Sequence, residues 1–281
     1  MTRQKRALAV HDISCVGKCS LTVVLPVLSA AGVETCVLPT SVLSTHTGGF
    51  GTPVFHDLTE ALSPFTDHWA SLGLTFDALY TGYLGSQAQI EQMEALFHRF
   101  GNGALKLVDP VMGDGGSLYS GFSSDFPQEM KKLCKTADVL VPNFTEAALL
   151  LEEPYREGPY TKDYVDGLLR RLARLCPGSI VLTGVYFDHQ QLGAATFDCA
   201  TGQISYALSP RVPGHFHGTG DLFASALLSA LLAEKSLQEA AAIAARFTAQ
   251  SIRLSDKARE SKYGVRFEAA LPSLMSDLEL L

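Results

Sequence analysis

The chain has 281 residues, of which 47% are hydrophobic and 18% charged, and it carries a formal net charge of -7. These proportions are typical of a folded globular protein and unlike those of a disordered chain. Because the net charge is negative and no apolar run approaches the ~18 residues of a membrane helix, we expect neither a nucleic acid nor a membrane as partner.

The first residues and the cysteines both indicate a cytoplasmic protein. The apolar stretch Ala7–Val10 is too short for a secretory signal sequence. The six cysteines are scattered along the chain without a Cys-x-x-Cys pair. This pattern predicts reduced thiols rather than disulfides or a zinc site.

Short apolar runs alternate with segments of helical periodicity along the chain. The predicted strands are Arg6–Val10, Glu34–Pro39, Ala78–Thr81, Leu105–Val108, Val139–Val141 and Ile180–Leu182. Helices are predicted at Ser86–Arg99, Ser124–Lys135 and Lys162–Leu175, a hairpin over 194–210, then a helix from near Asp221, an alanine-rich helix Leu237–Ile252 and a polar tail. This order predicts a single α/β domain over 1–281, a three-layer sandwich with a mostly parallel sheet, helices on both faces and the hairpin at one edge.

Polar and glycine-rich segments follow nearly every predicted strand. Ligands of open α/β sheets bind beyond the carboxyl ends of the strands. We therefore expect these segments to form one site. In chain order they are HDISCVGKCS, TSVLSTHTGGFG, TGYLGS, DPVMGDGGS, PNFTE and TGVYF.

Two familiar nucleotide-binding motifs are excluded. The sequence GKCS at 17–20 is similar to the end of a P-loop, but that motif needs Ser or Thr directly after the lysine and an earlier glycine. Cys19 and Asp12 occupy those two places. The glycine pair within 218–220 does not fit the dinucleotide fingerprint, because Phe223 stands where a third small residue belongs.

The segment HGTGDLFASALL, residues 217–228, joins a glycine-rich turn to the start of a buried helix. The N–H groups of the turn lie at the unsatisfied and partly positive end of that helix, where they can stabilise a phosphoryl group in transfer. A carboxylate there, Asp221, can accept the proton of an attacking hydroxyl. The alternative is that Asp221 or Thr219 only caps the helix.

Three further segments contain candidate ligands. Asp109 and Asp114 flank a Pro and a Gly after a strand and can hold Mg²⁺ on a nucleotide, the alternative being a turn with solvated acids. Asn143 with Glu146 three residues later is a capping box, which needs no function. The pair 183–184, Thr-Gly, is a weaker candidate.

Together these segments resemble the ribokinase-like superfamily and, within it, the pyridoxal and pyridoxamine kinases. The matching segments are LSTHTGG (43–49), TGYLGS (81–86), DPVMGDGGSLY (109–119), PNFTEAALL (142–150), TG (183–184), GTGDLFASALL (218–228) and YGVRFE (263–268). GTGD with DPVMGD is typical of the superfamily, and S-x-H-T-G with TGYLGS points to the vitamin B6 branch. The resemblance implies a homodimer that uses ATP and Mg²⁺ to phosphorylate the 5′-hydroxymethyl group of pyridoxal, pyridoxamine or pyridoxine.

The resemblance also implies roles for single residues. Asp221 would be the base, and the anion hole would be formed by Gly218, Thr219 and Gly220. The pyridine ring would contact Thr47, with His46 nearby, and Tyr83. The Mg–ATP and cation region would be served by Asp109, Asp114, Asn143 and Glu146. The phosphate groups would lie along Tyr119, Thr183 and Gly184.

Two positions depart from the family pattern. Familiar members end the first strand in a Gln-Ser-His turn, whereas this chain has Asp12 near that place. Asp12 could pair with a pyridinium nitrogen or a substrate amine, which would favour pyridoxamine, or it could simply form a turn. Val141 stands where relatives often have threonine, which removes one expected contact to a monovalent cation.

His215 and His217 could approach phosphate or could only pack within their loop.

The sequence leaves three alternative functions to this one. A hydroxymethylpyrimidine or hydroxymethylpyrimidine-phosphate kinase would share the catalytic helix and act on a similar heteroaromatic alcohol. A sugar kinase is disfavoured because the first third lacks an evident acid-rich lid. A non-catalytic vitamer-binding protein is disfavoured because Asp221, both glycines of the turn and both acids of 109–114 are present.

Overall fold

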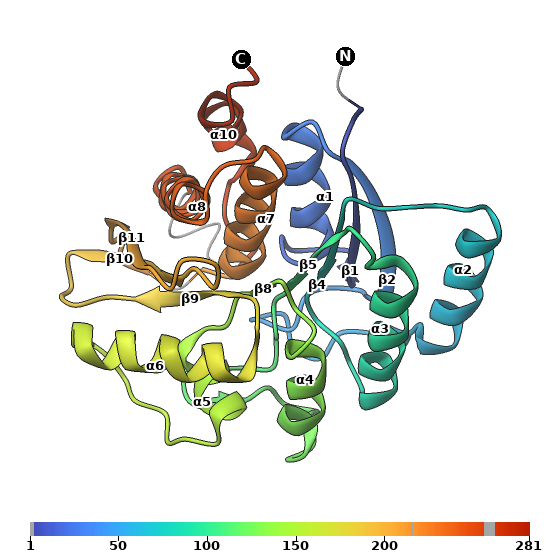
Figure 1. The fold of residues 1–281 in the computed structure, drawn as a ribbon, viewed down its shortest axis with the longest axis horizontal. Helices are drawn as coiled ribbons and strands as arrows, with labels where there is room; N and C mark the ends of the chain where they lie inside the picture. The colour runs from blue at the N-terminus through green and yellow to red at the C-terminus, as the bar shows by residue number, and fades with distance from the viewer. Residues whose placement is uncertain (1–2, 215, 256–261) are drawn as a thin grey trace.

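The computed structural model describes residues 3–214, 216–255 and 262–281, and within them a nine-stranded sheet runs through the molecule in the order β11-β10-β9-β8-β5-β4-β1-β2-β3 (Figure 1). The strands are β1 (Arg6–Ser14), β2 (Glu34–Leu43), β3 (Phe55–Asp57), β4 (Ala78–Thr81), β5 (Leu105–Val108), β8 (Val139–Leu140), β9 (Ser179–Val185), β10 (Gln191–Phe197) and β11 (Ile204–Pro210). The strands from β9 to β2 are parallel, and β3, β10 and β11 add antiparallel edges. A small ribbon of β6 (Gly113–Asp114) and β7 (Ser117–Leu118) stands apart from this sheet.

Helices cover both faces of the sheet (Figure 1). One face carries α1 (Leu21–Ala30), α7 (Thr219–Leu232), α8 (Leu237–Arg253), the 3₁₀ turn η1 (Glu268–Ala270) and α10 (Leu271–Asp277). The opposite face carries α2 (Thr59–Ser71), α3 (Gln87–Phe100), α4 (Phe126–Cys134), α5 (Phe144–Leu151) and α6 (Lys162–Leu175). In the described part of the chain, no helix is long and apolar enough to cross a bilayer.

The strands are apolar on both faces, so alternate residues enter two different cores. In β1, Ala7 and Ala9 pack under α1, α7 and α8, whereas Leu8 and Val10 pack under the helices of the opposite face. Successive side chains of a strand point to opposite faces. The near-continuous apolar runs of the sequence therefore indicate a parallel sheet buried on both sides.

The predicted fold class is confirmed, and the predicted strands and the edge hairpin are all present. The strands Ala78–Thr81 and Leu105–Val108 have the predicted bounds. The first strand does not end at Val10 but continues to Ser14, with a register shift against β2 between His11 and Ile13. The extension carries three buried polar side chains, His11, Asp12 and Ser14, which interrupt the apolar pattern that predicts a strand.

The prediction of a polar tail is wrong. Within the described residues of this segment, Val265 and Phe267 are buried in the core under α1, α7 and α8, and α10 adds Leu274 to the same core. These apolar residues are spaced too irregularly to show one period in the sequence. Only the packing against α1 and α8 reveals their role.

Candidate active site

The start of α7 is held open by a glycine in the left-handed conformation. Gly218 precedes the helix with φ of 76°, and a Cβ built there would lie 2.1 Å from the carbonyl oxygen of Lys18. Glycine is the residue that tolerates both conditions. The turn therefore brings the first N–H groups of α7, which have no acceptor within the helix, against the loop that follows β1.

Neither of the two side chains considered as caps closes this helix. The cap position is Gly218, which has no side chain to offer. Thr219 donates its hydroxyl hydrogen back to the carbonyl of Phe216, at 3.4 Å. The carboxylate of Asp221 accepts a hydrogen bond from the backbone N–H of Ser20, from a different segment, at 2.8 Å. The simple capping role is thus excluded for Asp221.

Asp221 has the electrostatic surroundings of a proton acceptor. Only 14% of its side chain is exposed. Burial is the main cause that raises its pKa to about 7. The hydrogen bond from the N–H of Ser20 lowers the pKa, and the negative charge of Asp12 raises it further. A carboxyl group with a pKa near neutrality can take up and release a proton at physiological pH.

Asp12 lies in β1 and not in a turn. Its two oxygens accept hydrogen bonds from the hydroxyls of Ser20, at 2.5 Å, and Ser14, at 3.2 Å. Burial raises its pKa, and the two hydroxyls oppose that shift. The hypothesis that Asp12 forms a turn is therefore wrong. Asp12 is instead a buried acid close enough for its charge to raise the pKa of Asp221.

Ser20 connects the two acids and was not recognised from the sequence. Its backbone N–H binds Asp221, while its hydroxyl binds Asp12. The residue has φ of 51°, an unfavourable conformation for a residue with a side chain, and such strain clusters at functional sites. The sequence signal was a serine directly before an apolar helix, which predicts a cap. In the structure the side chain makes no capping bond to α1.

Two more buried acids lie at the ends of β5 and β8. Asp109 follows β5, and burial together with the charges of Glu146 and Asp221 raises its pKa. Glu146 lies in the first turn of α5, which follows β8, and burial raises its pKa as well. Asp114 is exposed, with one oxygen accepting the N–H of Gly115. The interpretation as solvated acids therefore fits Asp114 and fails for Asp109.

The predicted capping box of α5 is confirmed and does more than cap. The side chain of Asn143 accepts the N–H of Glu146, and Glu146 accepts the N–H of Asn143. In addition, Asn143 donates to the carbonyl of Gly113 and Glu146 accepts the N–H of Met112. The box thereby fixes the loop that carries Asp109.

Asp109 and Glu146 fit a magnesium ion only if substrate phosphates or water supply the remaining ligands. Asp109 and Glu146 are buried close enough for each to disfavour the other's charge, a situation that a cation relieves. Among the residues described, no three His, Cys, Asp or Glu side chains are arranged to hold a metal by themselves. Mg²⁺ commonly uses one or two carboxylates and completes its shell with phosphate oxygens and water.

The residues expected at the pyridine ring lie on two other segments. His46 donates from Nε2 to the carbonyl of Lys262 at 2.9 Å and accepts the N–H of Gly48 at Nδ1, so both ring nitrogens are already bonded. Burial lowers its pKa, consistent with this neutral ring. Thr47 is exposed, and Tyr83 is half-buried against the ring of Phe122. Their contact with a substrate stays a prediction.

The residues expected along the phosphates lie at the same edge of the sheet. Thr183 and Gly184 belong to β9, and the hydroxyl of Thr183 donates to the carbonyl of Pro142. Tyr119 is half-exposed, and burial and the nearby acids, Glu146 first, raise its pKa so that it stays a hydrogen-bond donor. Their contact with ATP also stays a prediction.

One of the two candidate histidines can be placed. His217 packs beside the ring of His46, and a Cβ added to Gly48 would lie 2.3 Å from it. This agrees with packing within the loop. His215 lies outside the described residues.

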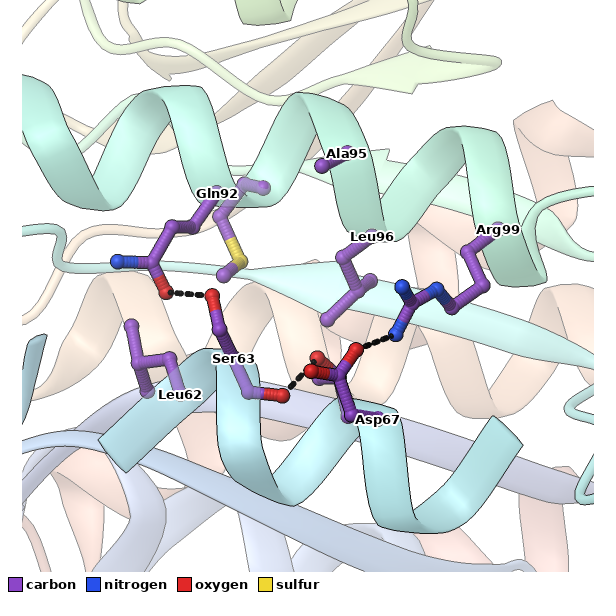
Figure 2. A pocket seen from close by; sticks show the side chains of 9 residues that line it. Leu62, Ser63, Asp67, Gln92, Ala95, Leu96 and Arg99 are labelled. Atoms are coloured by element: carbon purple, nitrogen blue, oxygen red, sulfur yellow. Dashed lines mark hydrogen bonds and ion pairs between the residues drawn. The ribbon is translucent and has the colours of Figure 1, made fainter. Parts of the chain in front are cut away.

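A small hollow lies between α2 and α3 (Figure 2). None of the candidate site residues lines it. Its volume is about 60 Å³, whereas ligand pockets usually exceed ~300 Å³. Polar side chains across it are paired, Ser63 with Gln92 and Asp67 with Arg99. It is a gap in helix packing and not a candidate for substrate binding.

Comparison with known proteins gives the following matches. The family model of phosphomethylpyrimidine kinase matches residues 27–266. A Bacteroides thetaiotaomicron protein, provisionally described as a phosphomethylpyrimidine kinase and crystallised with pyridoxal, is similar with a TM-score of 0.91 and 35% identity over 97% of this chain and 96% of that one. The pyridoxal kinase of Lactobacillus plantarum has a TM-score of 0.89 and 34% identity over 98% of each chain. BUD16 of Saccharomyces cerevisiae, provisionally described as a pyridoxal kinase, is 30% identical over 178 residues, which are 61% of this chain and 55% of that protein.

Proposed function

Because the chain belongs to the phosphomethylpyrimidine kinase family, we propose that it phosphorylates the 5′-hydroxymethyl group of a vitamin B6 vitamer with ATP. The observation that carries the proposal is Asp221, a largely buried acid whose side chain is 14% exposed and whose pKa is raised to about 7, at the open N-terminus of α7. Two similar proteins support the choice of vitamer, one a pyridoxal kinase and one crystallised with pyridoxal.

The reaction transfers one phosphoryl group and one proton. The substrate hydroxyl loses its proton to Asp221, and its oxygen forms a bond to the γ-phosphorus. The bond from that phosphorus to the bridging oxygen breaks, and ADP leaves. The N–H groups at the start of α7, at Gly218, Thr219 and Gly220, stabilise the negative charge that develops on the phosphoryl oxygens.

The acids after β5 and at the start of α5 serve the nucleotide. Asp109 and Glu146 would hold the Mg²⁺ that accompanies ATP and lowers the repulsion between its phosphates. Asp114, Asn143 and the pair 183–184 lie at the same edge and would bind ATP, with Tyr119 beside the phosphates. The vitamer ring would lie between Asp12 and Tyr83, near Thr47 and His46.

The second candidate function is phosphorylation of hydroxymethylpyrimidine or its phosphate, which the name of the matching family favours. Both reactions use the same base, anion hole and Mg–ATP, so the acids described above do not distinguish them. The difference must come from the residues that contact the heteroaromatic ring.

A panel of substrates tests the proposal. ATP consumption is measured with pyridoxal, pyridoxamine, pyridoxine, hydroxymethylpyrimidine and ribose, each with Mg²⁺. We expect the highest kcat/KM with a B6 vitamer. A higher value with the pyrimidine alcohol would transfer the assignment to the second candidate, and turnover of none of the five would reject the proposed function.

The acid at position 12 is expected to set the preference among vitamers. Asp12→Ala removes a buried carboxylate that can pair with a substrate amine, and a hydrogen bond to a charged group is worth roughly 1.5–3 kcal/mol. We expect kcat/KM for pyridoxamine to fall about tenfold further than that for pyridoxal. Ser14→Ala is the matched control, because it removes one hydrogen bond to Asp12 and keeps the carboxylate. Equal losses on both vitamers would discard the pairing.

A further inference from the structure

A histidine with no hydrogen bond lies behind the proposed base. His11 of β1 is fully buried, and among the described residues neither of its ring nitrogens has a hydrogen-bond partner. An unpaired buried polar group destabilises the folded state, so such groups are rare in folded proteins. An apolar side chain of similar size would avoid this cost.

The ring is confined on several sides. Its Nδ1 lies 3.9 Å from Oδ1 of Asp221. The imidazole and the Tyr80 ring pack edge to face, with a centroid distance of 4.4 Å. A Cβ built on Gly82 would lie 2.1 Å from the same Nδ1, so the glycine after β4 makes room for the imidazole. The ring therefore has little freedom to turn away from Asp221.

His11 is in a protonation state that allows it to donate one hydrogen bond. Burial lowers its pKa to about 3, so the ring is neutral and carries one N–H. The groups that face it are few. Asp221 approaches from α7 and Tyr80 from β4, and Asp12 is the next residue in β1. Asp109, at the end of β5, raises the pKa of Tyr80, and its own pKa is raised by the charge of Asp221.

We propose that His11 is a positioning residue for Asp221, donating a hydrogen bond from Nδ1–H to Oδ1 of the ionised carboxylate. Ser20 N–H already holds Oδ2, so the two donors together fix the plane of the carboxylate. The present separation of 3.9 Å has to shorten by roughly 1 Å to reach hydrogen-bonding distance. Catalytic hydrogen bonds are often long before substrate binds and tighten in the complex. The proposal rests on the proposed function, in which Asp221 is the base.

Three substitutions of His11 distinguish a positioning role from a role in packing alone. His11→Leu keeps a similar volume but has no donor. His11→Asn keeps an amide N–H near the position of Nδ1, whereas His11→Gln places its amide near Nε2. A structural role predicts that the three variants differ only in stability. A positioning role predicts that Asn retains activity that Leu and Gln lose.

The experiment measures kcat, KM, thermal unfolding and the pH profile of each variant with the best substrate of the panel. We expect His11→Leu to unfold at or above the wild-type temperature, because it removes two unpaired buried nitrogens, while kcat falls about ten- to hundredfold with KM for the vitamer unchanged. His11→Asn should recover most of kcat. Wild-type kcat in His11→Leu, or equal kcat in the Asn and Gln variants, would overturn the proposal.

A titration that does not depend on turnover completes the test. The ¹³C signal of the Asp221 carboxyl, assigned by its loss in Asp221→Asn, is followed against pH in the wild type and in the Leu and Asn variants. Loss of a donor to the charged form raises the pKa of an acid. We expect a higher midpoint in His11→Leu than in the other two, and equal midpoints would reject the inference even if the chain phosphorylates nothing in the panel.

Discussion

Asp221→Asn is expected to lower kcat by at least ~10² while ATP binding is preserved. The amide has the shape of the carboxylic acid, and its oxygen can still accept the N–H of Ser20, but it cannot take the proton of the substrate hydroxyl. Initial rates give kcat, and calorimetry with ATP gives the binding constant. Near-normal turnover in this variant would remove Asp221 from the role of base.

The pH profile provides a second measure of the same group. Because the pKa of Asp221 is raised to about 7 and the ionised form is the proposed base, kcat/KM should fall as pH falls through about 7. The same raised pKa makes the folded state more stable at low pH, whereas it makes the enzyme less active there. The contribution of Asp221 to stability is fully present below the ordinary value of 3.8 and is lost as pH rises through about 7. Asp221→Asn should therefore be at least as stable as the wild type at pH ~8, and a lower unfolding temperature there would mean that its lost activity reflects misfolding.

Gly218→Ala is expected to damage both the fold of the turn and catalysis. An alanine at φ of 76° costs roughly 1–2 kcal/mol, and its Cβ would lie 2.1 Å from the carbonyl oxygen of Lys18, so the turn or the loop after β1 must move. Movement of the turn misplaces the N–H groups of the anion hole. Loss of one such donor in other enzymes costs about 10²–10³ in kcat. We expect a drop of at least that size together with a lower unfolding temperature.

Gly220→Ala is the matched control for this effect. Apart from its chain neighbours and the adjacent backbone of α7, no atom of the described residues lies within 4 Å of a Cβ built there, and its own backbone is helical. The variant should therefore fold as well as the wild type. Equal destabilisation by the two substitutions, or wild-type kcat in Gly218→Ala, would contradict the account of Gly218.

The sequence was a good guide to the elements but a poor one to some of their ends. The strands at β4 and β5 have the predicted bounds because their apolar runs stop at polar or glycine residues. The end of β1 was missed because His11 and Asp12 are buried polar residues within a strand. A pattern of apolar residues cannot reveal a stretch of strand whose buried side chains are polar.

The site was predictable in part for a related reason. Residues that follow parallel strands must meet at one edge, so Asp12, Asp109 and Asp221 could be assigned to one region from the sequence. Ser20 acts through its backbone N–H, which every residue other than proline has, and His11 acts from behind the base. No residue type or spacing in the sequence marks either role.

The alternation of strands and helices, the glycine turn before α7 and the acids at the strand ends could all be predicted from the amino-acid sequence, because periodicity and turn chemistry depend on neighbouring residues. Only the tertiary structure decided that the N–H of Ser20 holds Asp221, that His11 stands behind it and that Asp109 and Glu146 share a buried region. The pKa of Asp221 is a consequence of that arrangement. Burial and the charge of Asp12 raise this pKa. Folding brings Asp12 and Ser20 next to Asp221, although Ser20 and Asp221 are 201 positions apart in the sequence.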